Sequence, residues 1–232
     1  MLRFYITLVQ LFLFTFFACA QKGGFVSISF QHQYDGKRFI VSDSGVAINT
    51  AKDLKINVLK YYVSHIRLFS SGTIVAQDTA LAHLIDASDT NSTSIIIPIH
   101  KNVVYDEIRF DLGIDSTTNV SGVLGGDLDP TKGMYWTWQS GYINFKLEGN
   151  SKQCTNPKKE FIYHIGGYAH PYSCIREVSL KVGGSSKAFI VLELKTIFDH
   201  VQLDKEANIM SPSQNATSFS KLLDKSFIVK EP

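Results

Sequence analysis

Hydrophobic and polar residues alternate along much of the chain, which is typical of half-buried β-strands. Val26, Ile28 and Phe30 share one parity, and His32 continues that side. The segment 104–112 alternates in the same way. Further strands are predicted at 54–69, 74–76, 81–86, 95–99, 161–165, 174–182 and 189–198, the last two as a hairpin across 183–186. About eight or nine short strands predict an all-β fold, an antiparallel β-sandwich with long loops.

The segment 133–142 holds both tryptophans of the chain, Trp136 and Trp138. Residues two apart on a strand project from the same face, so both indoles are expected on one face. The apolar positions downstream, at 143, 145 and 147, have the opposite parity. A β-bulge near Gly141 would reconcile the two halves. This face either packs under another sheet or lines a site, and the long loop 113–132 before it favours a site.

The first twenty residues are typical of a secretory signal peptide. Arg3 is followed by the apolar stretch 6–17 and by the small-residue cleavage site 18–20. The alternative is a lipoprotein acylated at Cys19, for which the preceding phenylalanines form a poor recognition sequence. We therefore expect an exported protein of the periplasm or cell surface, with lipid attachment through Cys19 as the less favoured alternative.

The remaining chain is expected to form one β-sandwich domain over 21–203, a size that suits a single core. A polar C-terminal tail follows over 204–232, partly ordered. Within it, 204–220 is expected to be weakly structured, and 222–229 is expected to dock back onto the domain.

Cys154 and Cys174 are the two cysteines left after the signal peptide. In an oxidising compartment an even pair predicts a disulfide. It would close a loop of about twenty residues and contribute roughly 3 kcal/mol. The alternative is a pair of soft metal ligands, but the spacing matches no zinc or iron–sulfur pattern.

Net charge is +2, so neither a nucleic-acid partner nor a polybasic membrane patch is predicted. The chain has no G-x-S-x-G nucleophile elbow and no phosphate-cradling glycine loop. We therefore expect a protein that is not an enzyme.

The seven histidines form no closely spaced pair, so a metal site would have to be assembled from different strands. His32 lies on an inward face, where it is either a core residue with a polar partner or a ligand. His164 precedes Gly166 at a strand end, and both a ligand role and a structural role are open for it. His170 is expected to be an ordinary loop residue, with a ligand role as the less favoured alternative.

Several segments of the chain resemble the MbnP-like family of exported proteins, which are related to the copper-binding partner protein of methanobactin operons. The most specific group runs from Gly125-Gly126-Asp127-Leu128-Asp129-Pro130 through 133–142 to Phe145-Lys146-Leu147-Glu148-Gly149. The segments 61–64, 66–68 and 112–115 and the sequence His164-Ile165-Gly166-Gly167-Tyr168 also resemble its motifs. The resemblance covers about 25–199, nearly the whole predicted domain.

This resemblance implies an unusual copper site. In members of the family, Cu(I) is held by two histidines and by kynurenine, which a di-haem protein of the cytochrome c peroxidase type makes by oxidising a tryptophan. Imidazole suits copper. Carried over here, the resemblance implies Trp136 (as kynurenine) or Trp138 at the metal, with His32 and His164 as ligands. An outer-membrane receptor is a further expected partner.

Two other functions remain open from the residues. Exposed Trp and Tyr rings would suit a non-catalytic binding module for a glycan or another surface partner, because large aromatic faces stack on sugars. The indoles could also be plain core residues of a structural protein.

Overall fold

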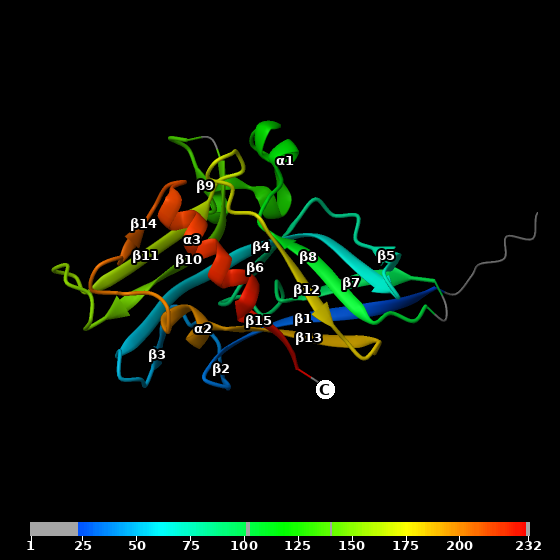
Figure 1. Ribbon diagram of the computed structural model, residues 1–232, viewed down its shortest axis with the longest axis horizontal. Helices are drawn as coiled ribbons and strands as arrows, with labels where there is room; N and C mark the ends of the chain where they lie inside the picture. The colour runs from blue at the N-terminus through cyan, green and yellow to red at the C-terminus, as the bar shows by residue number, and fades with distance from the viewer. Residues whose placement is uncertain (1–22, 101–102, 140, 231–232) are drawn as a thin grey trace, which may run out of the picture.

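The computed structural model describes residues 23–100, 103–139 and 141–230, and it shows two packed β-sheets with three short helices (Figure 1). The predicted signal peptide and Cys19 lie outside the described residues. Among the described residues, no helix has the length and apolar character needed to cross a bilayer.

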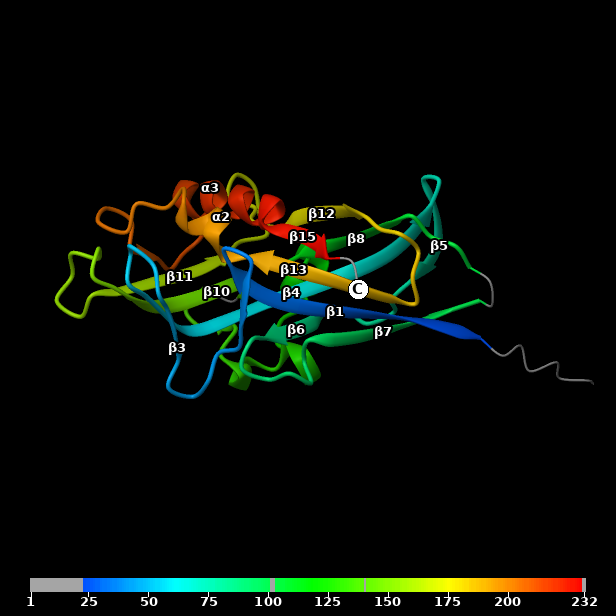
Figure 2. The ribbon, with the colours of Figure 1, turned by 90° about the horizontal axis from the view of Figure 1, so that it is seen from below.

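The smaller sheet has five strands, with the order β15-β13-β1-β2 and with β7 also paired to β1. Its strands are β1 (Gly24–Tyr34), β2 (Lys37–Phe39), β7 (Ser94–Ile99), β13 (Lys187–Glu193) and β15 (Phe227–Lys230). Figure 2 shows β13, β1 and β7 running side by side. The pairing of β1 with β13 is parallel, whereas β2, β7 and β15 join by antiparallel pairing.

The larger sheet has ten strands, with β12-β8-β4-β10-β11-β14 as its main path. These strands are β4 (Leu54–Ser70), β8 (Glu107–Leu112), β10 (Gly141–Ser151), β11 (Glu160–Gly166), β12 (Arg176–Lys181) and β14 (Asn208–Ile209). Four short strands attach to it: β3 (Val46–Ile48), β5 (Thr73–Gln77) and β6 (His83–Asp86) on β4, and β9 (Tyr135–Trp136) on β10. The mostly antiparallel β-sandwich predicted from the alternation is confirmed.

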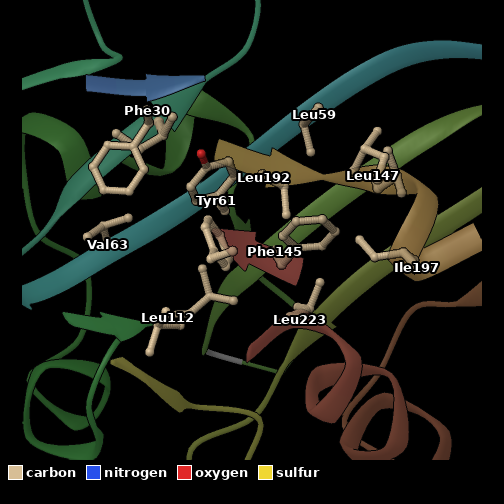
Figure 3. Close-up of a cluster of buried hydrophobic side chains, with 14 of the residues drawn as sticks. Phe30, Leu59, Tyr61, Val63, Leu112, Phe145, Leu147, Leu192, Ile197 and Leu223 are labelled. Atoms are coloured by element: carbon tan, nitrogen blue, oxygen red, sulfur yellow. The ribbon is translucent and has the colours of Figure 1, made fainter. Parts of the chain in front are cut away.

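The main core lies between the two sheets, on what we call the inner face of the larger sheet (Figure 3). Alternate residues of each strand point into it, as Tyr61 of β4 and Phe145 of β10 do, because side chains alternate across a strand. A second apolar cluster covers the opposite, outer face of the same sheet and includes Tyr62 and Trp136. The larger sheet is therefore buried on both faces near the tryptophans.

The C-terminal segment is better ordered than its polar sequence predicts. The helices of the described chain are α1 (Ser116–Val120), α2 (Leu194–Phe198) and α3 (Gln214–Leu223). Single 3-10 turns lie at 126–128 and 130–132, in the loop after α1, and at 224–226, directly after α3. Ser213 caps α3 by accepting a hydrogen bond from the N–H of Ala216, which satisfies one of the free donors of its first turn. Phe219 then packs on Phe145 and Tyr163 in the main core. The expectation of weak structure over 204–220 is therefore wrong, because one apolar side of α3 is enough to bind it to the core.

The hairpin predicted across 183–186 is also wrong. β12 pairs with β8 in the larger sheet, and β13 pairs with β1 in the smaller one. The connection therefore crosses from one layer to the other, and the strand predicted to run to residue 198 ends at Glu193, where α2 begins.

The predicted disulfide is absent: Cys154 and Cys174 are both buried, free cysteines. Lys159, just before β11, donates a hydrogen bond to the carbonyl of Cys154, while the N–H of Cys174 bonds to the carbonyl of Gly167, just after β11. The seven residues of β11 separate these two points by roughly 20 Å at the usual rise of a strand, well beyond the roughly 7 Å that a disulfide allows between Cα atoms. Burial raises the pKa of both thiols.

Candidate functional site

The two tryptophans lie on a tight hairpin rather than on one continuous strand. Trp136 of β9 pairs with Gly141 of β10, and Tyr135 pairs with Tyr142. Trp138 lies in the turn between the two strands. At Gly141 itself the chain reverses rather than bulges. A register shift follows within β10, between Ile143 and Phe145, so Ile143 joins the outer-face cluster whereas Phe145 and Leu147 point into the main core.

The hairpin gives the two indoles opposite environments. Trp136 is 5% exposed and belongs to the outer-face cluster, whereas Trp138 is 66% exposed. Their ring centroids are 5.9 Å apart, with the ring planes inclined by 47°. The expectation that both project from one strand face is wrong, but the two rings remain neighbours.

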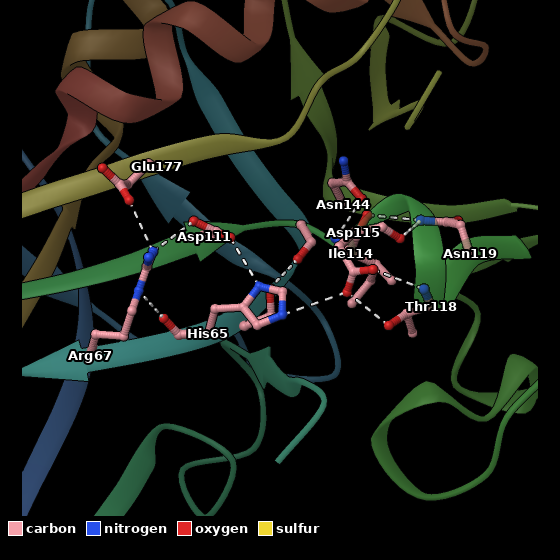
Figure 4. Close-up of polar contacts among 11 residues, drawn as sticks. His65, Arg67, Asp111, Ile114, Asp115, Thr118, Asn119, Asn144 and Glu177 are labelled. Carbon is pink, nitrogen blue, oxygen red and sulfur yellow. Dashed lines mark hydrogen bonds and ion pairs between the residues drawn. The ribbon is translucent and has the colours of Figure 1, made fainter. Parts of the chain in front are cut away.

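The loop 113–132 holds this hairpin in place through α1 (Figure 4). Asp115 caps the helix by accepting a hydrogen bond from the N–H of Thr118. The buried amide of Asn119 donates to the carbonyl of Ile114 at 2.8 Å and accepts from the N–H of Tyr142 at 3.0 Å. The predicted functional loop thus positions the strand that follows the tryptophans.

A second tether lies further along the same loop. The hydroxyl of Tyr62 donates to the carbonyl of Asp127, and the carboxylate of Asp127 accepts from the N–H of Leu84 and pairs with Lys132. The loop therefore closes over the outer-face cluster. Burial raises the pKa of Tyr62 and of Tyr142, so both phenols stay protonated.

His164 lies on the same face of the sheet as Trp136. Its neighbours Tyr163 and Ile165 point into the main core, so His164 points outward, opposite Lys146 of β10. Its Nε2 is 2.7 Å from Oε1 of Glu148, and this hydrogen bond lowers the pKa of Glu148. Gly166, two residues further on the same face, lies directly under the indole: a Cβ built there would be 2.8 Å from Cζ3 of Trp136.

A pocket of about 190 Å³ opens beside Trp136. The loop 167–172, which leaves β11 just beyond His164, forms one wall, and the tryptophan hairpin forms the other. Its lining includes the side chains of Trp136, Gln139, Tyr142, Tyr168, His170 and Tyr172. His170 was expected to be an ordinary loop residue, and the signal for its placement is the cluster of aromatic residues directly after the Gly166-Gly167 pair.

His32 lies elsewhere. It is 4% exposed in the main core, where its Nε2 is 3.1 Å from the hydroxyl of Tyr61. Burial lowers the pKa of His32 to about 4. Tyr61 points to the inner face and Trp136 covers the outer one, so the larger sheet separates His32 from Trp136. Of the two predicted histidine ligands, only His164 lies on the side of the tryptophan.

Three further histidines are engaged with protein groups. Nδ1 of His65 is 2.9 Å from Asp111 (Figure 4), Nε2 of His83 is 2.6 Å from Asp78, and Nδ1 of His200 contacts the carbonyl of Thr196. Within the described ranges, no three side chains of His, Cys, Asp or Glu come together as a ready metal site. A metal site at Trp136 with three protein donors would therefore need at least one donor that is not a His, Cys, Asp or Glu side chain.

The indole nitrogen of Trp136 provides the test of whether a copper site fits here. Among the described residues, no hydrogen-bond partner reaches this buried Nε1. Buried polar atoms are normally paired, so an orphaned one marks a position where strain, a ligand or chemistry is expected. Opening of this indole would supply an aromatic amine and a ketone as donor groups beside the pocket that His170 lines, on the sheet face to which His164 also points. The imidazoles on this side of the sheet, those of His164 and His170, are of a ligand type that suits copper.

Comparisons with known proteins give the same family. The family model described as MbnP matches residues 23–211. Among solved structures, MbnP from Methylosinus trichosporium matches with a TM-score of 0.58 and 16% sequence identity, over 84% of this chain and 87% of that chain. At that identity the likeness shows a common fold. No curated protein matches this chain.

Proposed function

Because the chain belongs to the MbnP family, we propose that it is an exported copper-binding protein without catalytic activity of its own. The observation that carries this proposal is the buried Trp136, whose Nε1 has no partner among the described residues and whose ring lines the same pocket as His170. His164 points to the same face of the larger sheet. The cofactor is Cu(I). It would make this outer-face site a store or a carrier of the metal.

In this proposal Trp136 is oxidised to kynurenine, and His164 and His170 supply the imidazoles. His164 is oriented by Glu148, whose carboxylate holds one ring nitrogen and leaves the other available. Histidines that bind metals are commonly fixed in this way by a carboxylate. His170 lies on a loop and lines the same pocket as the indole, so it can approach without rearrangement of the sheet.

The oxidation requires a partner, and the family resemblance suggests a di-haem protein of the cytochrome c peroxidase type. Export by the signal peptide at 1–20 would bring both proteins into the same compartment, the periplasm or the cell surface. An outer-membrane receptor is a second proposed partner, for delivery or uptake of the metal.

Mass spectrometry of protein from the native host tests the modification. A peptide in which Trp136 has lost one carbon and gained one oxygen supports kynurenine. Unmodified Trp136 from cells that express the oxidising partner would count against it. Protein made without the partner serves as the unmodified reference.

Copper titration of the modified protein tests the ligands. We expect His164→Ala and His170→Ala to lose the metal and His32→Ala to keep it. His200→Ala is the matched control, because that imidazole is exposed and lies on α2's C-terminal turn. Loss of copper in His32→Ala, with binding retained in the other variants, would move the site to the inner face.

A second candidate function rests on Trp138, whose ring is 66% exposed, and on Tyr172, which is 41% exposed. Exposed aromatic faces bind sugars by stacking. A hit on a glycan array that Trp138→Ala abolishes would favour a non-catalytic binding module for a glycan or surface partner.

A further inference from the structure

The exposed position of Trp138 does not suggest a role in stabilising the fold. It lies in the turn of the hairpin with two thirds of its surface in solvent, although a large apolar ring gains stability from burial. Its ring nevertheless lies against that of Trp136, with 5.9 Å between the centroids. One indole of this pair faces solvent and the other faces the candidate site.

Trp136 itself is closed to any large reactant. It is 5% exposed, its far edge lies on Gly166, and the pocket beside it holds about 190 Å³. A protein-bound redox group is too large to enter a pocket of that size. A protein-bound oxidant that acts on Trp136 must therefore draw its electron through intervening groups.

We propose that Trp138 is an electron relay, through which an external one-electron oxidant at the surface withdraws electrons from the buried Trp136. This inference rests on the proposed oxidation of Trp136. The inference assigns to Trp138 the transfer of electrons from Trp136, and it places the contact surface for the oxidant on the hairpin turn.

The electrons balance over two transfers. The oxidant accepts one electron from the indole of Trp138 and is itself reduced by one electron, which leaves a cation radical on Trp138. An electron from Trp136 then refills Trp138. The net change is one electron lost by Trp136 and one gained by the oxidant, with Trp138 restored. No bond forms or breaks in these two transfers.

The proton on Nε1 of Trp136 stays on the ring during the electron transfer. Among the described residues, Nε1 of Trp136 has no acceptor within hydrogen-bonding distance, so no side chain is placed to take its proton when the ring is oxidised. An indole can carry the positive charge without losing that proton, which keeps the charge on the ring where chemistry is needed.

The neighbouring tyrosines are poorer relays. Tyr135 and Tyr142 lie in contact, with 5.0 Å between their centroids, but oxidation of a phenol requires loss of its proton. Burial raises the pKa of Tyr142, and its hydroxyl oxygen accepts a hydrogen bond from the N–H of Leu124. The phenolic proton of Tyr142 is donated to the carbonyl of Gly122 at 3.3 Å, and a carbonyl is too weak a base to remove it.

The test uses the protein without copper and without its biological partner. Photogenerated tris(bipyridine)ruthenium(III) serves as the surface oxidant, and tandem mass spectrometry assigns oxidation to Trp136 or Trp138. We expect oxidation of Trp136 in the unsubstituted protein and its loss in Trp138→Phe, which keeps an aromatic ring but removes the easily oxidised indole. Tyr172→Phe is the matched control, since Tyr172 is exposed and lines the same pocket.

Equal oxidation of Trp136 in Trp138→Phe and in the unsubstituted protein would overturn the relay, as would an absence of any oxidation at Trp136 in the latter. Transient absorption on Trp136→Phe supplies a second readout, in which the relay predicts a longer-lived Trp138 radical because its electron donor is missing. Because copper takes no part in this experiment, a working relay in a protein that binds no copper would leave the relay standing and overturn the proposed function alone.

Discussion

His32 combines a titratable ring with nearly complete burial, and this makes the fold sensitive to acid. Among the described residues, the hydrogen-bond partner of its Nε2 is the hydroxyl of Tyr61, a neutral group, and the aromatic ring of Phe39 lies beside it. The burial that lowers its pKa to about 4 from an ordinary value of 6.5 favours the neutral imidazole in the folded state. The unfolded chain therefore binds this proton more readily than the folded protein does.

The first prediction follows from that difference. The stability that neutral His32 contributes is fully present above pH 6.5 and is lost as the pH falls from 6.5 toward 4, by about 3 kcal/mol in total. Urea unfolding at steps between pH 7 and pH 4 measures it. His32→Gln, which keeps a polar side chain near Tyr61 but does not titrate, should show a flatter profile over this window. An unchanged profile in the variant would assign the acid sensitivity to other groups.

Glu148 belongs to the candidate site through its effect on His164. Its hydrogen bond to Nε2 fixes the orientation of the imidazole, and Lys146 is 3.3 Å from the same carboxylate oxygen. We predict that Glu148→Gln weakens copper binding by the modified protein about 10–100-fold, the usual cost of losing such an orienting partner. Glu160→Gln is the control, because Glu160 is an acidic residue of the same strand pair whose partner Lys158 is exposed. Equal affinities for both variants would remove His164 from the ligand set.

At this scale the sequence identified types of residue better than it identified partners. It nominated Trp136 and His164, which share the outer face, and His32, which does not. The placement of His32 has a physical cause. His32 belongs to β1 of the smaller sheet, and neither the alternation nor the spacing of residues in the sequence shows which face of the larger sheet β1 packs against. The position of His170 beside the Trp136 pocket was not predicted, because a loop residue next to a proline carries no periodic signal.

At the scale of elements, the tryptophan hairpin is held against β11 by a close fit at Gly166. A Cβ at this position would be 2.7 Å from the carbonyl oxygen of Tyr142 and 2.8 Å from Cζ3 of Trp136, and the carbonyl belongs to the backbone and cannot give way cheaply. The glycine is therefore required by the hairpin that carries the site.

We predict that Gly166→Ala destabilises the protein by about 1–3 kcal/mol, the usual cost of overpacking, and displaces Trp136. Urea unfolding gives the first quantity. Fluorescence in a Trp138→Phe background, where Trp136 is the remaining tryptophan, gives the second. Gly183→Ala is the matched control, since a Cβ there meets open space. If the emission of Trp136 in Gly166→Ala is as blue-shifted as in the same background with Gly166, the hairpin tolerates the methyl group.

The strands themselves were mostly predictable, because alternation is a local property that one buried face imposes. The errors fall where long-range packing decides the structure. Residues 137–139 form a turn although their sequence suggests a strand, and 183–186 connects two sheets although its sequence suggests a hairpin. In both cases the local sequence permits a strand or a turn, and long-range packing selects between them. The helix α3 was missed because its ten residues carry few large apolar side chains.

At the scale of the whole molecule, the C-terminal segment completes the sandwich. Phe227 of β15 lies 5.7 Å from Tyr61 of β4 and 5.4 Å from Phe110 of β8, measured between ring centroids, so it joins the smaller sheet to the core face of the larger one. Phe219 and Leu223 of α3 are buried in the same core. The family match ends at residue 211, before all three of these side chains.

We therefore predict that a chain truncated after residue 211 fails to fold, although it retains the entire family match, because removal of three large core side chains exceeds the stability of an ordinary domain. Circular dichroism and thermal unfolding of the truncated protein measure this. Phe227→Ala gives a graded version, with an expected loss of about 3–5 kcal/mol. Its control is Ile228→Ala, at a side chain that is 44% exposed, where we expect a change within about 0.5 kcal/mol. A truncated chain with a cooperative transition near that of the full chain would show that the core closes without α3 and β15.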